Sequence, residues 1–403
     1  MPAVPTSTPT PGSTPTPGPA DRSRPAVSVE NVYKVFGRRP VKAVQRLTEG
    51  ASRDDVKNLG TAAVIDASFE VAQGEIFVVM GLSGSGKSTL IRMLNGLWKP
   101  TAGHVRIGDD DLSTVDAKRL RALRRTRVSM VFQHFALLPH RTVLDNAAYP
   151  LEIQGMPREQ RIAKATEALE MVGLGGWADS LPSQLSGGMR QRVGLARALA
   201  ADTDVLLMDE AFSALDPLIR REMQEQLLEL QRTLHKTIIF ITHDLNEAMH
   251  LGDRIAVMRD GRIVQIGTSE EILSEPANDY VAQFVADVDR TRVLTAQSVM
   301  VPPADGTTYS ATSDDSQYVE QDTPLAELFA PAAESAAPLE VHDDAGDLVG
   351  VIPRDALLEA MVPGTEPETT TEAPGSDARG AMGAPPTDEP ALPGPATTKG
   401  ATA

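Results

Sequence analysis

The 403-residue sequence contains no cysteine, which excludes disulfide bonds, a thiol nucleophile and cysteine-based metal sites. It also lacks long hydrophobic runs, since the longest lie at 76–80, 205–208 and 237–242. A membrane-spanning helix needs roughly 20 apolar residues, so none of these runs predicts one. The first 26 residues have neither a basic start nor an apolar segment and do not resemble a secretory signal. We therefore expect a soluble protein that stays inside the cell.

Aromatic residues make up only 4% of the chain, and basic residues are scarce in its C-terminal part. From residue 301 onward there are 19 acidic but only 3 basic residues, whereas the preceding 300 residues are nearly neutral. The basic run at 117–127 is interpreted as the solvated face of a helix. Because a nucleic-acid-binding domain presents a basic face, neither part predicts a nucleic-acid partner.

The segment 76–95 predicts a strand, a glycine-rich loop and the start of a helix. The loop has the pattern GxxxxGKS, which ends in Lys87 and Ser88. Backbone N–H groups can converge on a phosphate here because glycines leave the approach open, and the helix N-terminus adds donors. In this pattern the lysine reaches the β- and γ-phosphates and the serine hydroxyl ligates Mg²⁺. The sequence thus predicts a nucleoside triphosphate site.

Strands alternate with helices along the chain, which predicts an α/β fold with a mostly parallel sheet. Gly81, Asp209 and His243 each fall at the end of a buried strand, where the ligands of such sheets bind. Phe36 precedes the phosphate loop at the end of another predicted strand. Two interpretations of Phe36 remain open, a platform on which adenine stacks and an aromatic of the core.

A second glycine-bearing turn, at 185–192, reads LSGGMRQR and opens a second predicted helix. A single triphosphate needs only one phosphate loop, so the second turn requires an explanation. The chain resembles the ATP-binding subunit of an ABC transporter over roughly residues 28–285. The motifs that carry the resemblance are the Walker A loop at 81–89, Gln133 of the Q-loop, the signature at 185–191, Walker B at 205–209, the adjacent Glu210, the D-loop at 213–216 and the switch His243.

The resemblance implies a P-loop NTPase of the ABC type that binds ATP and Mg²⁺ and works as a head-to-tail dimer. It implies that Glu210 is the general base, assisted by His243, Gln133 and Lys87. Implied metal ligands are Ser88, Gln133 and Asp209. Implied ATP contacts are Phe36, Gly81, Leu82, Ser83, Gly84, Ser85, Gly86, Lys87, Ser88, Thr89, Gln133 and Asp216, with Ser186, Gly187 and Gly188 supplied by the second copy.

Finer details resemble the ATPases of glycine betaine/proline importers, which take up osmoprotectants and quaternary amines. These details are Leu82 in Walker A, Ala211 and Phe212 after Walker B, an insertion at 38–60 that is interpreted as partly helical, and the segment 276–281. The resemblance implies a position on the cytoplasmic face of the cell membrane, where residues 135–150 would meet an integral membrane permease. An extracytoplasmic solute-binding protein would deliver the solute. Alternatives are an importer of another small solute and a soluble, non-transport ABC ATPase, which the single Walker A disfavours.

The predicted domains are an ABC nucleotide-binding domain at 28–288, with a RecA-like core and a helical subdomain at about 136–200, and a small α+β domain at 289–362. The small domain resembles a degenerate cystathionine-β-synthase-type (CBS) module. Pro353 and Ala356 stand where ligand-binding modules carry Thr or Ser and Asp, so packing or dimerisation is favoured over ligand sensing. Residues 1–27 and 363–403 are predicted to be disordered from their composition.

Overall fold

The computed structural model describes residues 24–133, 136–213, 215–286, 288–302, 318–335, 337–343 and 345–361. The tail predicted for 363–403 and most of the tail predicted for 1–27 lie outside these ranges. So does residue 135, where the region predicted to meet a permease begins. The first strand, β1, begins at Val27, one residue before the predicted start of the nucleotide-binding domain.

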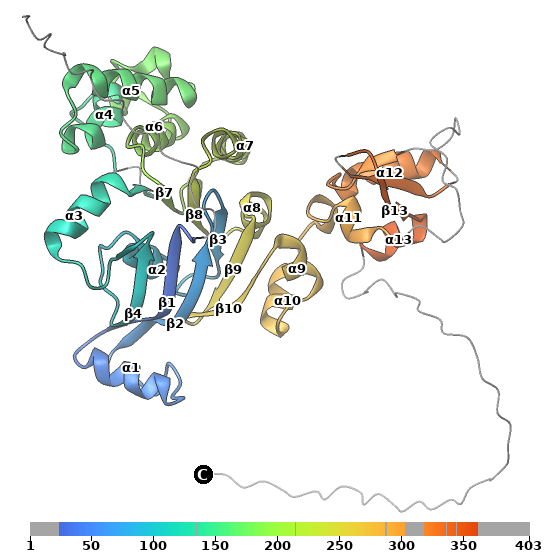
Figure 1. Cartoon of the computed structure of the whole chain (residues 1–403), viewed down its shortest axis with the longest axis horizontal. Coiled ribbons are helices and arrows are strands. Elements are labelled where there is room, and N and C mark those ends of the chain that lie inside the picture. Colours follow the sequence, from blue (N-terminus) through green and yellow to red (C-terminus); the bar gives the residue numbers. More distant parts are fainter. Residues whose placement is uncertain are drawn as a thin grey trace, which may run out of the picture. The chain divides into compact units, whose positions relative to one another are not determined.

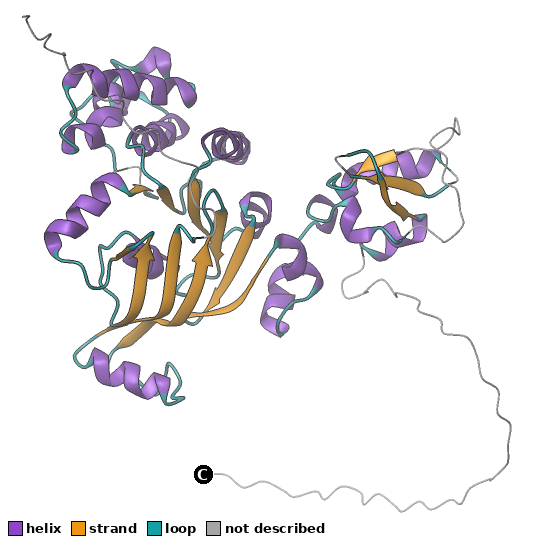
Figure 2. Ribbon diagram, in the orientation of Figure 1, coloured by secondary structure: helices purple, strands orange, loops and turns teal. Residues whose placement is uncertain are grey.

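A six-stranded sheet in the order β10-β9-β3-β8-β7-β6 forms the centre of the nucleotide-binding part (Figures 1 and 2). Its strands are β3 (Ile76–Met80), β6 (Val128–Val131), β7 (Val205–Asp209), β8 (Thr237–Thr242), β9 (Arg254–Arg259) and β10 (Arg262–Gly267). Neighbouring strands are parallel except in the β9–β10 hairpin. Every residue of β3, β7 and β8 is buried, as expected for strands covered on both faces. The predicted mostly parallel sheet is confirmed.

Adjacent parallel strands end at one edge of the sheet, and this edge positions the site. The register pairs Met80 of β3 with Thr242 of β8, and Asp209 of β7 with Ile241 of β8. The residues that follow these strands therefore emerge side by side.

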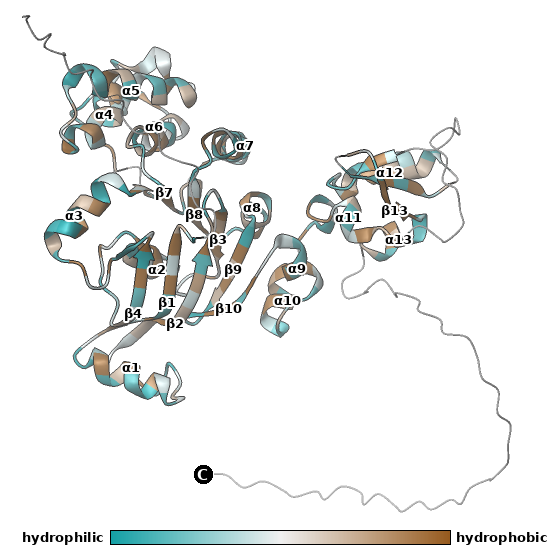
Figure 3. Cartoon of the chain, in the orientation of Figure 1, coloured by the Kyte–Doolittle hydropathy of each residue, from teal (hydrophilic) through white to brown (hydrophobic). Residues whose placement is uncertain are grey.

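A separate antiparallel sheet has the order β2-β1-β4-β5. Its strands are β1 (Val27–Phe36), β2 (Thr61–Val71), β4 (Ala102–Ile107) and β5 (Asp110–Asp111). It shares a buried core with the parallel sheet, in which the rings of Phe69 and Phe77 stack 4.9 Å apart. Brown, hydrophobic segments accordingly recur along the strands of both sheets in Figure 3. The sequence predicts the strand that ends at Phe36 but not a second sheet.

The helices that accompany the two sheets are α2 (Lys87–Leu94), α3 (Ala117–Thr126), α7 (Pro217–Leu234), α8 (Leu245–Leu251), α9 (Ser269–Ser274) and α10 (Asp279–Val285). In α3 only Leu123 is buried, so the basic run forms an exposed helix face as predicted. The insertion at 38–60 contains α1 (Pro40–Thr48), which confirms its partly helical character. Ala43 and Leu47 of α1 pack against Tyr33 of β1 in a small core of their own.

The region predicted as a helical subdomain contains α4 (Val143–Ile153), α5 (Arg158–Met171) and α6 (Gly187–Ala200), which pack on one another. Short 3₁₀ turns at Gly175–Trp177 and Pro182–Gln184 connect α5 to α6. Leu151, Leu169 and Leu195 are buried in one core that also includes residues of β3, β7 and β8. The start of α6, which carries the signature turn, is therefore fixed by packing to the parallel sheet.

The C-terminal part begins with a 3₁₀ turn at Arg290–Arg292 and has its own hydrophobic core. Its elements are α11 (Ala296–Val299), β11 (Tyr318–Glu320), α12 (Leu325–Glu334), β12 (Leu339–His342), β13 (Leu348–Ile352) and α13 (Arg354–Glu359). β12 pairs in parallel with β11 and antiparallel with β13. This is a small α+β unit, and its likeness to a CBS module stays a prediction. Over the part of the chain that the structure describes, no helix is both long enough and apolar enough to cross a membrane.

Candidate nucleotide site

The phosphate loop connects the end of β3 to α2. Gly81 and Gly86 have positive φ values of 147° and 109°. A Cβ at Gly81 would lie 2.2 Å from the carbonyl oxygen of Met258, and one at Gly86 would lie 2.3 Å from that of Ala63. Both glycines are therefore required, because the loop backbone packs directly against β9 and β2 and no side chain fits between them.

Lys87 is the first residue of α2 and is buried against the loop. Its Nζ donates hydrogen bonds to the carbonyl oxygens of Gly81 at 2.6 Å and Leu82 at 3.2 Å. Burial lowers the pKa of Lys87, and the Glu210 and Asp209 carboxylates act against this effect. The ammonium group is thus held inside the loop, where it would neutralise a bound phosphate.

Ser85 and the start of α2 offer further donors to such an anion. Among the described residues, Ser85 Oγ is buried without a hydrogen-bond partner. A buried hydroxyl of this kind is usually paired, so its position in the loop fits contact with a phosphate oxygen. The glycine cradle, the lysine and this hydroxyl together suit a triphosphate.

Ser88 and Asp209 meet across the site, with Ser88 Oγ 3.5 Å from Asp209 Oδ1. Burial raises the pKa of Asp209, and the nearby Arg92 guanidinium opposes that rise. Mg²⁺ prefers hard oxygen ligands and binds through one or two protein groups together with water and phosphate oxygens. The hydroxyl and carboxylate fit the predicted metal site, whose assignment stays a prediction.

Glu210 follows β7 in a left-handed conformation, with φ 45°. Gln133 Nε2 donates a hydrogen bond of 3.3 Å to Glu210 Oε2, and His243 Nδ1 lies 3.2 Å from the same oxygen. These three residues follow β6, β7 and β8, so the edge of the parallel sheet brings together the predicted catalytic side chains. Gln133 thus contacts the Glu210 carboxylate, and its role as a metal ligand stays a prediction.

The signature turn, at 185–192, differs from the phosphate loop in what surrounds its glycines. Ser186 Oγ accepts a hydrogen bond from the Met189 N–H at 3.2 Å and so caps α6. A Cβ on Gly187 would meet no atom within 4 Å, and one on Gly188 would meet only the Ile219 side chain of α7. Among the described residues, no hydrogen bond joins this turn to the phosphate loop of the same chain.

Asp216 similarly caps α7, because its Oδ1 accepts a hydrogen bond from the Ile219 N–H at 3.1 Å. Its predicted contact with ATP stays a prediction.

Phe36 ends β1 and is partly exposed, at 37%. Its ring makes an edge-on contact with Trp98, at 4.9 Å between centroids. Trp98 was missed by sequence reasoning because nothing in the periodicity of the chain relates residues 36 and 98.

A buried carboxyl group was missed as well. Glu247 of α8 accepts hydrogen bonds from Thr242 Oγ1, at the end of β8, and from Gln224 Nε2 of α7 at 3.1 Å. Burial raises the pKa of Glu247, and the two hydrogen bonds oppose the rise. Glu247 therefore links the turn that carries His243 to the helix that supports Gly188.

A glycine loop around a buried lysine, beside a serine, an aspartate and a further carboxylate at one sheet edge, defines a P-loop nucleoside triphosphatase. The family model for the ABC transporter matches residues 64–213. The chain belongs to the ABC transporter family as an ATP-binding protein and a transport ATPase.

Three relatives illustrate the match. The glycine betaine transport ATP-binding protein OpuAA of Bacillus subtilis is 58% identical over 276 residues, which cover 68% of this chain and 66% of OpuAA. The glycine betaine/proline betaine transport system ATP-binding protein ProV of Escherichia coli is 53% identical over 275 residues, 68% of this chain and 69% of ProV. The trimethylamine N-oxide transport system ATP-binding protein TmoW of Ruegeria pomeroyi is 44% identical over 339 residues, 84% of this chain and 97% of TmoW.

Among solved structures, the chain is similar to the ATP-binding cassette MJ0796 in a dimeric post-hydrolysis state bound to ADP and Pi. The TM-score is 0.52 and the identity 32%, and the match covers 60% of this chain and 98% of that chain. That cassette is dimeric.

Proposed function

We propose that this chain is the ATP-hydrolysing subunit of an importer for solutes with a methylated nitrogen, with glycine betaine as the first candidate. The observation that carries the ATPase part is the Glu210 carboxylate, held by Gln133 and His243 beside the phosphate loop. The solute class rests on the relatives, whose names include glycine betaine, carnitine, proline betaine and trimethylamine N-oxide.

Hydrolysis requires a water molecule in line with the γ-phosphate and a base that takes its proton. Gln133 and His243 both contact Oε2 of Glu210, which leaves Oε1 to accept a hydrogen bond from that water. The water oxygen bonds to the γ-phosphorus while its proton passes to Glu210, and the oxygen that bridged the β- and γ-phosphates leaves with ADP. Lys87 neutralises charge on the transferred group.

Mg²⁺, held through Ser88 and Asp209 with Gln133 nearby, would neutralise the β- and γ-phosphates. Burial raises the pKa of Asp209, and the charges of Arg92 and Lys87 oppose this rise. His243 would sense the γ-phosphate and hold Glu210 in its reactive position.

The second half of each site would come from a second copy of the chain. Ser186 caps a 14-residue helix, α6, and Gly187 and Gly188 are its first two residues. The free N–H groups and the dipole of a helix N-terminus favour an anion. Open space at Gly187 leaves room for a phosphate, and MJ0796, a similar cassette, is dimeric. Two chains packed head to tail would then enclose two ATP molecules.

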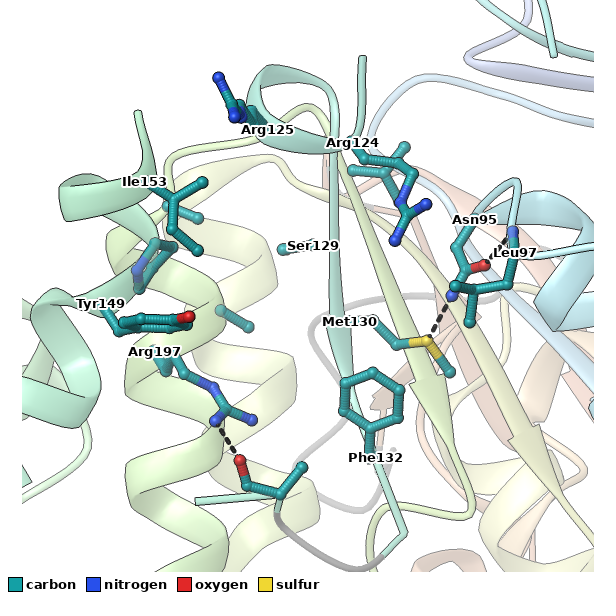
Figure 4. A pocket seen from close by; sticks show the side chains of 15 residues that line it. Asn95, Leu97, Arg124, Arg125, Ser129, Met130, Phe132, Tyr149, Ile153 and Arg197 are labelled. Carbon is teal, nitrogen blue, oxygen red and sulfur yellow. Dashed lines mark hydrogen bonds between the residues drawn. The ribbon is translucent and has the colours of Figure 1, made fainter. Parts of the chain in front are cut away.

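A groove of about 430 Å³ between the helical region and β6 is the proposed docking site for the permease (Figure 4). Tyr149 and Ile153 of α4 line one side, and Phe132 and Leu97 line the other. Leu97, Phe132 and Ile153 are unusually exposed for large apolar side chains, and such clustered exposure marks interaction surfaces.

Arg197 contributes to the same groove, where its NH1 donates a hydrogen bond of 2.6 Å to the Ala136 carbonyl oxygen (Figure 4). Phe132 directly precedes Gln133, so a permease segment seated here would reach Glu210 through one peptide bond and one hydrogen bond. This would couple solute movement to hydrolysis. The chain would lie on the cytoplasmic face of the membrane, and an extracytoplasmic binding protein would supply the solute.

The test is uptake of labelled solutes by proteoliposomes that contain the permease complex with either the wild-type chain or Glu210→Gln. We expect ATP-dependent uptake of glycine betaine, proline betaine, carnitine, choline or trimethylamine N-oxide by the wild type and none by the variant, with proline, which has no methylated nitrogen, as the comparison solute. ATP hydrolysis without a membrane partner, and without stimulation by any solute, would contradict the proposal and favour a soluble ABC ATPase.

A further inference from the structure

Two aromatic rings, Phe36 and Trp98, lie next to each other between two cations, Lys34 and Arg92. Lys34 Nζ lies 5.1 Å from the centroid of the Phe36 ring, and the Phe36 and Trp98 rings meet edge-on at 4.9 Å with an interplanar angle of 76°. The Arg92 guanidinium lies over the Trp98 ring at 4.9 Å. We call Lys34, Phe36, Trp98 and Arg92 the aromatic row.

Backbone contacts fix both ends of this row. The Trp98 N–H donates to the Arg92 carbonyl oxygen at 3.0 Å, which holds the tryptophan at the end of α2. Lys34 Nζ donates to the Lys99 carbonyl oxygen at 2.6 Å, and the Thr101 N–H donates to the Tyr33 carbonyl oxygen at 2.7 Å. The turn after α2 is thereby fastened to the end of β1, immediately before Phe36.

Phe36 has no polar group that could orient its ring, so packing must set the ring plane. Edge-on aromatic pairs are attractive, and a guanidinium over the indole adds a cation–π contact. We propose that Trp98 is a positioning residue that holds the Phe36 ring as the platform for the adenine of ATP. This inference rests on the proposed function, and it favours the nucleotide interpretation of Phe36 over the core interpretation.

The aromatic row also reaches α2, the helix that follows the phosphate loop. Arg92 is one turn beyond Ser88 on α2, and its charge acts on Asp209, the proposed metal carboxylate. Trp98 would therefore set the base platform from the turn that follows α2, the helix that carries the phosphate-binding Lys87.

Steady-state ATPase assays of Trp98→Leu and Trp98→Phe test the inference. Trp98→Leu should raise KM for ATP roughly three- to tenfold while kcat stays near the wild-type value. Trp98→Phe keeps an aromatic ring and should restore most of the affinity. Trp177→Leu removes the other tryptophan, which is exposed in the helical region, and should leave KM unchanged.

A double-mutant cycle with Phe36→Leu separates positioning from stability. If Trp98 acts through Phe36, the double variant should bind ATP as weakly as Phe36→Leu alone. A purely structural Trp98 would lower the thermal midpoint of Trp98→Leu without changing KM, and that result would overturn the inference. Equal KM values for Trp98→Leu and the wild type would do the same while leaving the proposed function intact, whereas a wild type without ATPase activity would refute that function first.

The fluorescence of Trp98 provides a second test of the inference in case Trp98→Leu does not fold. In Trp177→Phe, Trp98 is the sole tryptophan of the chain. ATP should change its emission, and GTP at the same concentration should change it less. Emission that does not respond to ATP under conditions where the protein hydrolyses it would contradict the inference.

Discussion

Two glycine-bearing turns open helices in this chain, and they differ in what surrounds their glycines. In the phosphate loop, Gly81 and Gly86 press against backbone carbonyls of β9 and β2 and have positive φ values. In the signature turn, Gly187 faces open space and Gly188 meets only the flexible side chain of Ile219. The fold itself requires glycine in the first turn.

Nothing in the fold of one chain accounts for Gly187. A glycine that packing within the chain does not require suggests that a ligand or partner approaches the backbone there. This agrees with the proposed contact in trans. The glycines of the phosphate loop thus serve the fold and the ligand, whereas those of the signature turn would serve contact with a second copy.

The largest effect is expected from Glu210→Gln, which removes the base and leaves both turns intact. The amide can keep the contacts with Gln133 and His243 but cannot take a proton, so phosphate release should slow by about 10²–10⁴-fold. Glu225→Gln is the matched control, since Glu225 is an exposed partner of His250. Hydrolysis by Glu210→Gln at the wild-type rate would remove Glu210 from the proposed role.

Gly187→Asp should abolish activity without harming the fold. A carboxylate at the start of α6 interacts favourably with the helix dipole, so the thermal midpoint should stay constant or rise. The same charge would repel the γ-phosphate of the partner's ATP, and hydrolysis should fall by at least about a hundredfold. Phosphate release measures the hydrolysis rate, and thermal unfolding of the same preparation measures the midpoint. Normal activity would place the signature turn outside the site.

Gly86→Ala should show the opposite pattern, with the fold affected first. Alanine at a φ of 109° with its Cβ beside the Ala63 carbonyl oxygen must displace either the loop or β2. We expect the free energy of unfolding to fall by at least about 2 kcal/mol, measured by urea denaturation. Gly155→Ala, at a positive φ but in open space, controls for backbone strain alone. Equal losses in both variants would mean that the close approach to β2 is unimportant.

The smallest effect concerns Glu247, which joins α7, beneath the signature turn, to the His243 turn. Its pKa is raised in the folded state, so its protonated form stabilises the fold below the unfolded pKa of about 4.3, and this stabilisation is lost as pH rises through the folded pKa. Glutamine has no such proton to lose. Relative to Glu247→Gln, the wild type should therefore become less stable on going from acidic to neutral pH.

Urea denaturation of both proteins at several pH values measures this difference. Asp244 and Arg220, whose charges act on the pKa of Glu247, are present in both proteins, so the two proteins differ only in the side chain at position 247. A difference in stability that does not change with pH would show that Glu247 keeps the same protonation state on folding.

Much of the candidate site could be predicted from the sequence because its residues follow buried strands. Lys87, Glu210 and His243 each come directly after such a strand or its loop, and parallel strands must end at the same edge. The glycine patterns marked both turns, although the sequence could not tell which glycines the fold itself needs.

The remainder depends on contacts between distant residues. The pairing of β1 with β2 and β4 in a separate sheet, the packing of Trp98 on Phe36 and the burial of Glu247 beside Gln224 join segments that local periodicity cannot relate. Such contacts are set by how the layers pack, so they became visible only in three dimensions.

The most direct test is the mass of Glu210→Gln in solution, measured by light scattering with and without ATP and Mg²⁺. If two copies enclose the nucleotide, ATP should convert single chains into dimers, and Glu210→Gln/Gly187→Asp should remain a single chain although Lys87 and its loop are unchanged. Dimers of the double variant, or hydrolysis at full rate by single wild-type chains, would contradict a site shared between two copies.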